Sequence, residues 1–176
     1  MPFRRAKKTW DEATLYEYAI GALGRRMRSV AELKRLLRER VRGSEAGEAH
    51  IEAVIRRLKD QRYLNDAGYA ATYAYLRKEN EKFGRQRVIS DLKTRGVHQE
   101  VIEKVVSGAY ADINEEQLAR DYLRRKRVSK PGNEKEAARV FRALVRAGFG
   151  SRTIIAILKK WEVEDEVLSA LEQELE

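Results

Sequence analysis

The sequence predicts an all-helical protein built from three tandem copies of a three-helix unit. Apolar residues recur at helical spacing along most of the 176 residues. No Asn-Gly or Asp-Gly dipeptide separates alternating apolar runs, as short β-hairpins usually require. The apolar pattern also repeats with a period of 51 to 52 residues. Together these observations indicate a helical repeat protein rather than a sheet.

Individual helices are recognised by their apolar stripes and start signals. Leu15, Ala19, Ala22 and Leu23 lie at spacings that place them on one helix face. An oxygen-bearing side chain followed three residues later by Glu or Gln predicts a capping box at the start of a helix. Asp66 is expected to cap the helix that begins beside it. The four predicted capping boxes are Thr9 with Glu12, Ser29 with Glu32, Asn114 with Gln117 and Asn133 with Glu136.

The repeats align when one leucine is matched in each middle helix, namely Leu36, Leu92 and Leu144. Gly96 and Gly148 then fall where a helix ends and a left-handed residue is needed. Because a unit of about fifty residues buries only a small core, neighbouring units are expected to pack together in an elongated, curved array. The predicted parts are a basic N-terminal tail at 1–9, repeats at 10–64, 66–110 and 114–161, and a short acidic C-terminal helix at 162–176.

Composition limits the possible environment. Cysteine is absent, which excludes disulfides and thiolate metal sites and suits a reducing compartment. The basic start is not followed by an apolar signal-peptide core, and the longest aliphatic run, 154–158, is far too short to span a membrane. We expect a cytoplasmic protein, without membrane association and monomeric.

The sequence contains no recognisable catalytic constellation. Its two histidines, His50 and His98, fall near helix starts and are expected to be capping or surface residues. Neither a phosphate-binding Gly-Lys-Ser/Thr loop nor a Gly-x-Ser-x-Gly motif occurs. Carboxylates are scattered along helices, where pairs with Lys or Arg explain them. We therefore predict a protein that is not an enzyme and has no metal and no cofactor.

Positive charge is the most informative feature of the surface. The net charge is +9, and residues 162–176 hold seven carboxylates without Lys or Arg, so the positive excess lies in the first 161 residues. Such a field favours polyanions or an acidic protein surface, although helical proteins also expose many charges that only face solvent. The predicted binding residues follow the repeats: Arg25, Arg26, Arg28, Lys34, Arg38, Arg77, Lys78, Lys82, Arg85, Arg87, Arg124, Arg125, Lys126, Arg127, Lys135, Arg139, Arg142 and Arg146.

A set of short segments in the three repeats forms a recognisable pattern: 19–23, Arg25-Arg26, Arg28-Ser29, Glu32-Leu33, Tyr63-Leu64-Asn65-Asp66, Tyr69-Ala70, Gly84-Arg85, Val88-Ile89, Asp91-Leu92, Gly96-Val97, 144–149 and Ile154. Taken together, these segments resemble the RecX family over about residues 13–161. The loop at 43–47 is longer than the family pattern, and the acidic segment 162–176 matches no motif of it. The resemblance implies a protein that binds the filament of RecA recombinase on DNA and inhibits its ATPase, coprotease and strand-exchange activities in repair, recombination and the SOS response. It also implies some contact with single- and double-stranded DNA.

Two other functions remain open at this point. The repeats would also suit a stand-alone DNA-binding protein whose helix ends lie near phosphates. The recurring side chains are Arg and Lys without a matching set of Asn or Gln, which favours backbone contact with weak dependence on DNA sequence. A helical scaffold without a nucleic-acid role is a further alternative.

Overall fold

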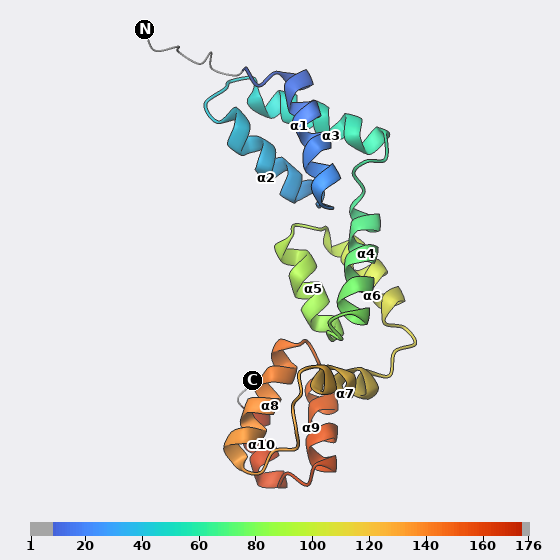
Figure 1. Cartoon of the computed structure of the whole chain (residues 1–176), viewed down its shortest axis with the longest axis vertical. Helices are drawn as coiled ribbons and strands as arrows, with labels where there is room; N and C mark the ends of the chain where they lie inside the picture. The colour runs from blue at the N-terminus through green and yellow to red at the C-terminus, as the bar shows by residue number, and fades with distance from the viewer. Residues whose placement is uncertain (1–8, 174–176) are drawn as a thin grey trace. The chain divides into compact units, whose positions relative to one another are not determined.

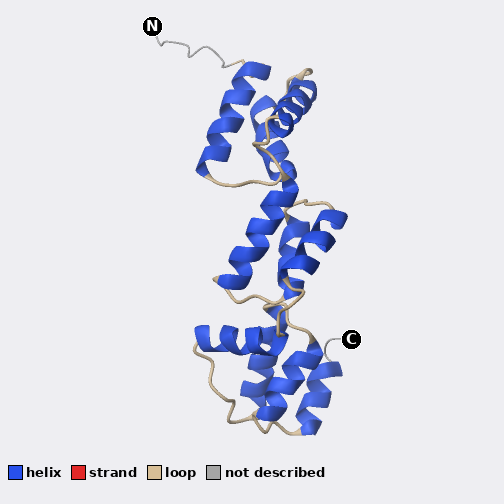
Figure 2. Ribbon diagram, turned by 90° about the vertical axis from the view of Figure 1, so that its right-hand side faces the viewer, coloured by secondary structure: helices blue, strands red, loops and turns tan. Residues whose placement is uncertain are grey.

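The structure is a computed structural model that describes residues 9–173. Over that range it consists of ten α-helices. Figures 1 and 2 show these helices and the loops between them, without a strand in the described residues. The predicted all-helical fold class is therefore confirmed. The helices are α1 (Glu12–Arg25), α2 (Val30–Val41), α3 (Gly47–Asp60), α4 (Asp66–Glu79), α5 (Arg85–Thr94), α6 (Gln99–Ala109), α7 (Glu115–Arg125), α8 (Glu134–Arg146), α9 (Ser151–Lys160) and α10 (Asp165–Gln173).

The first repeat is a bundle of α1, α2 and α3 around its own core. Helix α3 contacts both α1 and α2. Leu15, Leu33, Leu37, Ile51 and Leu58 are fully buried in one cluster. Their i, i+3, i+4 and i+7 spacing on amphipathic helices places them on the faces that meet, so the apolar stripes determine how the bundle packs.

The second repeat consists of α4, α5 and α6. Helix α5 contacts α6. Val88, Leu92, Ile102 and Val106 are fully buried, which confirms the expected burial of Leu92 and Ile102. In the first repeat, by contrast, the fully buried leucine is Leu37, and Leu36, which the sequence alignment matched to Leu92, is only partly buried.

The third repeat has a fourth helix. Phe141, Leu144 and Ile154 are buried in the core of α7, α8 and α9. Leu168 and Leu171 of α10 join the same cluster, and α10 contacts α8 and α9 (Figure 1). The acidic segment predicted as an additional helix is therefore part of this core, and its apolar side supplies the contact.

Three of the five predicted helix caps are present in the structure. Ser29 accepts a hydrogen bond from the Glu32 amide, and Glu32 accepts one in return, which completes a capping box. Asn114 and Asn133 accept from the amides three residues later. These bonds satisfy donors that a helix start leaves unpaired.

Two predicted caps are wrong. The N-cap of α1 is Asp11, whose carboxylate accepts from the Thr14 amide at 2.9 Å; Thr9 has no such role. At α4 the side chain of Asn65 accepts from the amides of residues 67 and 68. Asp66 instead accepts a hydrogen bond from the Val30 amide at 2.8 Å. Both errors arise because neighbouring residues have side chains that are equally able to cap, and the backbone path selects between them.

The chain separates into two compact parts, one comprising residues up to Tyr69 with Arg95–His98, and the other comprising Ala70–Thr94 with the residues from Gln99 onward. Within the first part, the turn after α5 covers the first turn of α2. The Ser29 hydroxyl donates to the Arg95 carbonyl at 2.6 Å, and the Arg95 guanidinium pairs with Glu32 at 2.6 Å. Gly96 follows with φ of 73°, which confirms its predicted left-handed conformation.

The second compact part contains a similar contact between α8 and α5. The Gly84 amide donates to the Ala147 carbonyl at 2.8 Å, and the Gln86 amide donates to the Gly148 carbonyl at 3.2 Å. Gly148 has φ of 89°, again as predicted for a left-handed helix end. In both parts, the turn that follows one middle helix covers the first turn of another. Each of these two contacts joins residues of successive repeats.

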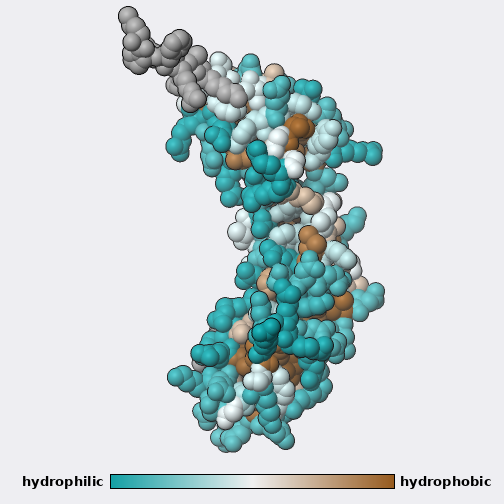
Figure 3. Space-filling model, in the orientation of Figure 1, coloured by the Kyte–Doolittle hydropathy of each residue, from teal (hydrophilic) through white to brown (hydrophobic). Residues whose placement is uncertain are grey.

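The surface of the described residues is largely hydrophilic in the view of Figure 3. Among these residues no helix is both long and apolar enough to cross a membrane. The predicted basic tail at 1–9 lies outside the described residues, apart from residue 9, as do residues 174–176 of the predicted acidic helix.

Candidate nucleic-acid and protein interface

The outer face of α8 carries a row of exposed cationic side chains opposite its buried face. Lys135, Arg139, Arg142 and Arg146 are exposed, whereas Phe141 is fully buried. Arg142 has a partner. Within residues 9–173, the side chains of Lys135, Arg139 and Arg146 form no ion pair. This row therefore retains positive charge that can be offered to an anionic partner.

The contact between α5 and α8 brings further predicted residues to one end of this row. Arg87 donates to the Arg146 carbonyl at 3.4 Å and pairs with Asp91 at 3.1 Å. Its guanidinium also lies 5.6 Å from the centre of the Phe83 ring. Arg85, two residues earlier, is exposed and donates to Ser107 at 3.1 Å. Residues from two repeats thus share one cationic surface in the second compact part.

Other predicted cations are already paired across the first repeat. Lys34 lies 2.5 Å from Glu52, and Arg38 lies 2.8 Å from Glu48. The hydrogen bond from Arg38 lowers the pKa of Glu48, and the same bond raises the pKa of Arg38. Because both pairs are exposed, they contribute little to stability, but they reduce the charge that α2 presents to a phosphate.

The ends of α4 and α7 meet in a region of mixed charge. Lys82 lies 3.7 Å from Glu79, Arg124 lies 3.0 Å from Asp121, and Arg125 lies 3.3 Å from Glu81. Arg77 stacks over the rings of Tyr73 and Phe83, Lys78 donates to the Ala109 carbonyl, and Lys126 lies 5.9 Å from the Tyr122 ring centre. Most of these side chains have structural partners, so this region is less cationic than the sequence indicates.

The remaining predicted residues lie at helix ends. Arg25 and Arg26 are exposed at the end of α1, and Arg28 is half-buried with its Nε shielded from solvent and without a hydrogen bond among the described residues. Arg127 is exposed in a left-handed conformation with φ of 55°. Arg25, Arg26 and Arg127 therefore remain candidates for anion contact.

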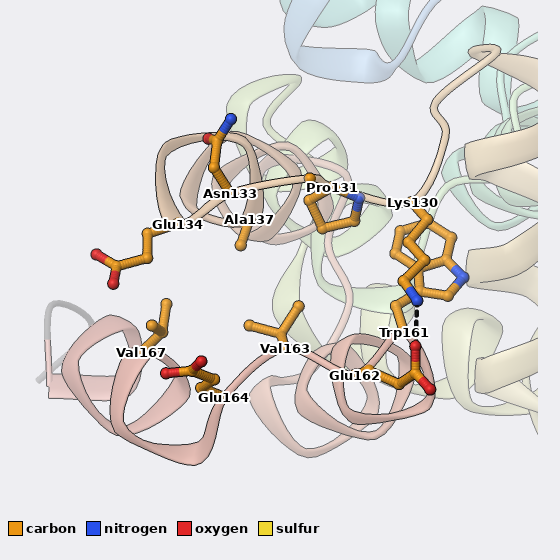
Figure 4. A pocket seen from close by; sticks show the side chains of 11 residues that line it. Lys130, Pro131, Asn133, Glu134, Ala137, Trp161, Glu162, Val163, Glu164 and Val167 are labelled. Carbon is orange, nitrogen blue, oxygen red and sulfur yellow. Dashed lines mark hydrogen bonds and ion pairs between the residues drawn. The ribbon is translucent and has the colours of Figure 1, made fainter.

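The described residues hold no group of three or more His, Asp or Glu side chains suited to a metal ion. They do contain a hollow of about 250 Å³ at the start of α8, which we call the α8 hollow. Ala137 lies on one side, Val163 and Val167 lie opposite, and Trp161 lies beside Lys130 at one end (Figure 4). Its walls also include Lys130 and the carboxylates of Glu134, Glu162 and Glu164.

Sequence reasoning missed the residues that join the repeats. Two of them bind the first turn of α2. Arg95 pairs with Glu32, which lies 63 residues away in the sequence, and Asp66 accepts from the amide of Val30, which lies 36 residues away. Such separations leave no periodic signal. Gly84 and Gly148 are the one signal in the sequence that could have indicated a junction. Two segments whose backbones approach closely need a residue without a Cβ at the point of contact.

Three comparisons identify the relatives of this chain. Residues 65–106 match the family profile described as RecX, second three-helix domain. The chain is 32% identical to the regulatory protein RecX of Myxococcus xanthus, and the match covers 83% of this chain and 82% of the relative. It is also 32% identical to the regulatory protein RecX of Deinococcus radiodurans, and that match covers 87% of this chain and 72% of the relative. It spans 58% of the longer RecX of Bacillus velezensis, at 28% identity over 89% of its own length.

Solved structures show the same fold. The crystal structure of RecX from Lactobacillus salivarius superposes with a TM-score of 0.68 at 19% identity, covering 86% of this chain and 97% of that one. A second RecX crystal structure superposes with a TM-score of 0.64 at 20% identity, covering 85% and 71%. Together with the relatives at 32% identity, these matches confirm the resemblance seen in the sequence: the chain belongs to the RecX family of regulatory proteins.

Proposed function

We propose that this protein binds the filament that RecA forms on DNA and lowers its ATP hydrolysis, coprotease activity and strand exchange. In this proposal it acts in the cytoplasm, in DNA repair, recombination and the SOS response, without catalysis of its own. Family membership over most of the chain is the observation that carries the proposal. The repeated helical architecture supports it, because tandem units spread a binding surface over many residues.

The DNA of the filament is the proposed partner of the α8 row. Exposed Arg and Lys side chains without acidic partners bind phosphates irrespective of base sequence. Lys135, Arg139 and Arg146 meet this description among the described residues, and Arg85 and Arg127 add to it. Lys34 and Arg38 are weaker candidates, since Glu52 and Glu48 already pair with them.

A stand-alone, sequence-nonspecific DNA-binding protein is the second candidate. The observation that favours it is the same unpaired charge on α8, which needs only phosphates as partners. The two functions differ in what they require of RecA. Direct DNA binding proceeds without RecA, whereas filament regulation changes a RecA activity at protein concentrations too low to coat the DNA.

The experiment measures strand exchange by the RecA of the same host with increasing amounts of this protein. Our proposal predicts inhibition at amounts well below one protein per RecA-sized stretch of DNA. Inhibition that appears only when the free DNA is saturated would support the second candidate instead. The same titration with a RecA-independent helicase on the same DNA serves as the control.

A further inference from the structure

The first repeat contains a cleft of about 430 Å³, which we call the Trp10 cleft. It lies where the segment before α1 runs beside the turn between α2 and α3 (Figure 1). Trp10 lines it from the first segment, Arg40 and Arg42 line it from the end of α2, and His50 lines it from α3. A volume of this size suits a small molecule or one unit of a polymer.

The turn that forms one wall of the cleft is folded onto α2. The Ser44 amide donates to the Val41 carbonyl at 2.9 Å, and the Gly47 amide donates to the Ser44 carbonyl at 3.1 Å. Gly47 lies so close to Val41 that a Cβ on Gly47 would be 2.8 Å from a methyl carbon of Val41. On the other side of the cleft, Asp11 caps α1 by accepting from the Thr14 amide. Both walls are therefore held by contacts of their own backbone.

Arg40 is held in place by two aromatic rings. It donates to the Tyr18 hydroxyl at 2.8 Å, and its guanidinium lies 4.8 Å from the centre of the Tyr18 ring and 5.9 Å from that of Trp10. The rings of Trp10 and Tyr18 meet edge to face with their centres 5.5 Å apart. A guanidinium has several N–H donors, so the bond to Tyr18 leaves others for an anion. Because Arg40 is already ordered, binding an anion costs it less conformational entropy.

The charges around the Trp10 cleft favour an anion. Arg40 and Arg42 are exposed and form no ion pair within the part of the chain that the structure describes. His50 adds an imidazole without a hydrogen bond among the same residues, and its Nδ1 is shielded from solvent, which leaves Nε2 to meet a ligand. Asp11 is the carboxylate of the lining, and it is engaged as the cap of α1. Two guanidinium groups thus face a single carboxylate that already has a partner.

The aromatic ring indicates which anion fits. Trp10 is half-buried and lies beside Arg40, so the cleft offers a flat apolar surface next to cationic donors. Nucleotides combine the two matching groups, because their phosphates bind Arg and their bases stack on aromatic rings or guanidinium planes. Inorganic phosphate would use only the cations of the cleft, and a nucleoside would use only the ring.

We propose that the Trp10 cleft binds a single nucleotide, with its phosphate on Arg40 and Arg42 and its base against the ring of Trp10. A free nucleotide and one nucleotide of a single DNA strand present the same groups, and the experiments below separate these two sources. The inference goes beyond the proposed function and requires no RecA. Its failure would therefore leave the proposed regulation of RecA standing.

Fluorescence of Trp10 provides the first test. The chain has two tryptophans, so Trp161→Phe leaves Trp10 as the only indole. Titration of this variant with adenosine monophosphate should quench its fluorescence saturably, and adenosine or inorganic phosphate should bind at least about tenfold more weakly. Saturable quenching by a short thymidine strand but not by adenosine monophosphate would support the proposal with a DNA strand as the source. Absence of saturable quenching with both ligands would overturn it.

A pair of charge variants in the Trp161→Phe background locates the ligand. Arg42→Gln removes a cation of the cleft that forms no ion pair, and it should weaken binding of the quenching ligand about tenfold. Arg56→Gln is the matched control, because Arg56 is an exposed cation of α3 outside the lining of the cleft. It changes the net charge equally and should bind the ligand as the parent does. Equal weakening by both substitutions, or by neither, would contradict the assigned site.

Nuclear magnetic resonance of the two histidines tests the same contact without any substitution. His50 lines the Trp10 cleft, whereas His98 is exposed at the turn before α6 and serves as an internal reference. Adenosine monophosphate or the thymidine strand should shift the imidazole signals of His50 and leave those of His98 in place. Signals of His50 that do not move, or equal shifts of both histidines, would overturn the proposal. Should circular dichroism show that Trp161→Phe is unfolded, this measurement on the unaltered chain decides.

Discussion

Gly148 approaches Arg87 so closely that a Cβ on Gly148 would lie 2.2 Å from the Arg87 amide nitrogen. Real Cβ atoms do not come so near a backbone atom of another residue. The approach allows the carbonyls at the end of α8 to accept from the amides at the start of α5. Gly84 lies on the other side of the same contact. The close packing of these two repeats therefore requires glycine at both positions.

Replacing Gly148 with Ala should destabilise the protein strongly. The substitution combines a left-handed conformation, which costs about 1 to 2 kcal/mol for a residue with a Cβ, with a clash against backbone that cannot move aside. Gly43→Ala is the control, because Gly43 has φ of 84° but open space around its Cβ position. Chemical denaturation should show a larger loss for Gly148→Ala than for Gly43→Ala. Equal losses would mean that the close approach is absent in solution.

Asp66 should matter through Val30 rather than through its own helix. Asp66→Ala leaves the Val30 amide without its acceptor, at a cost of about 1 to 3 kcal/mol for an unsatisfied, partly buried donor. Asp66→Asn keeps a side-chain oxygen and should cost less. Hydrogen exchange at the Val30 amide is the specific measurement, since it should accelerate in Asp66→Ala but stay slow in Asn65→Ala. Acceleration in Asn65→Ala alone would contradict this arrangement.

The sequence predicts the helices and their buried faces because these follow from local periodicity. Leu92 and Ile102 are fully buried as expected, and Gly96 and Gly148 have the expected left-handed conformations. Caps were less predictable, as Asp66 illustrates, because adjacent polar residues compete for the same role. The candidate surface was only partly predictable. An Arg side chain can bind an anionic partner only if no carboxylate already pairs with it, and such carboxylates can lie far away in the sequence. Glu81, which pairs with Arg125, is an example.

Acid should weaken the contact of α7 with α9. Hydrogen bonds from Lys160 and Arg120 lower the pKa of Glu116 below its ordinary value of 4.5. A carboxyl group with a lowered pKa in the folded state contributes stability that is present above about pH 4.5 and is lost as the pH falls through the folded value. Lys160→Met should therefore lower the free energy of unfolding at pH 7, with the difference from the parent shrinking near pH 3. A difference that grows on acidification would contradict the assignment.

DNA binding should depend on salt according to which cations are unpaired. Removing Arg139 or Arg146 by substitution with Gln should reduce the magnitude of the slope of log K against log salt by about 0.7 to 0.9 each. Arg38→Gln should change it less, because Glu48 already pairs with Arg38. Titrations of fluorescent single- and double-stranded DNA at several salt concentrations measure these slopes. Equal slopes for all three variants would place the DNA surface elsewhere.

The regulatory claim is tested most directly by the ATPase rate of RecA from the same host on single-stranded DNA. We expect the parent protein to lower this rate. Reversing Lys135, Arg139 and Arg146 together to Glu should weaken the inhibition, because contacts spread along α8 are lost together. Reversing Arg56, Lys93 and Lys104, three exposed cations outside that row, changes the net charge equally and should leave more inhibition. An unchanged ATPase rate with the parent protein would contradict RecA regulation, and equal inhibition by the two reversed variants would contradict the role of α8.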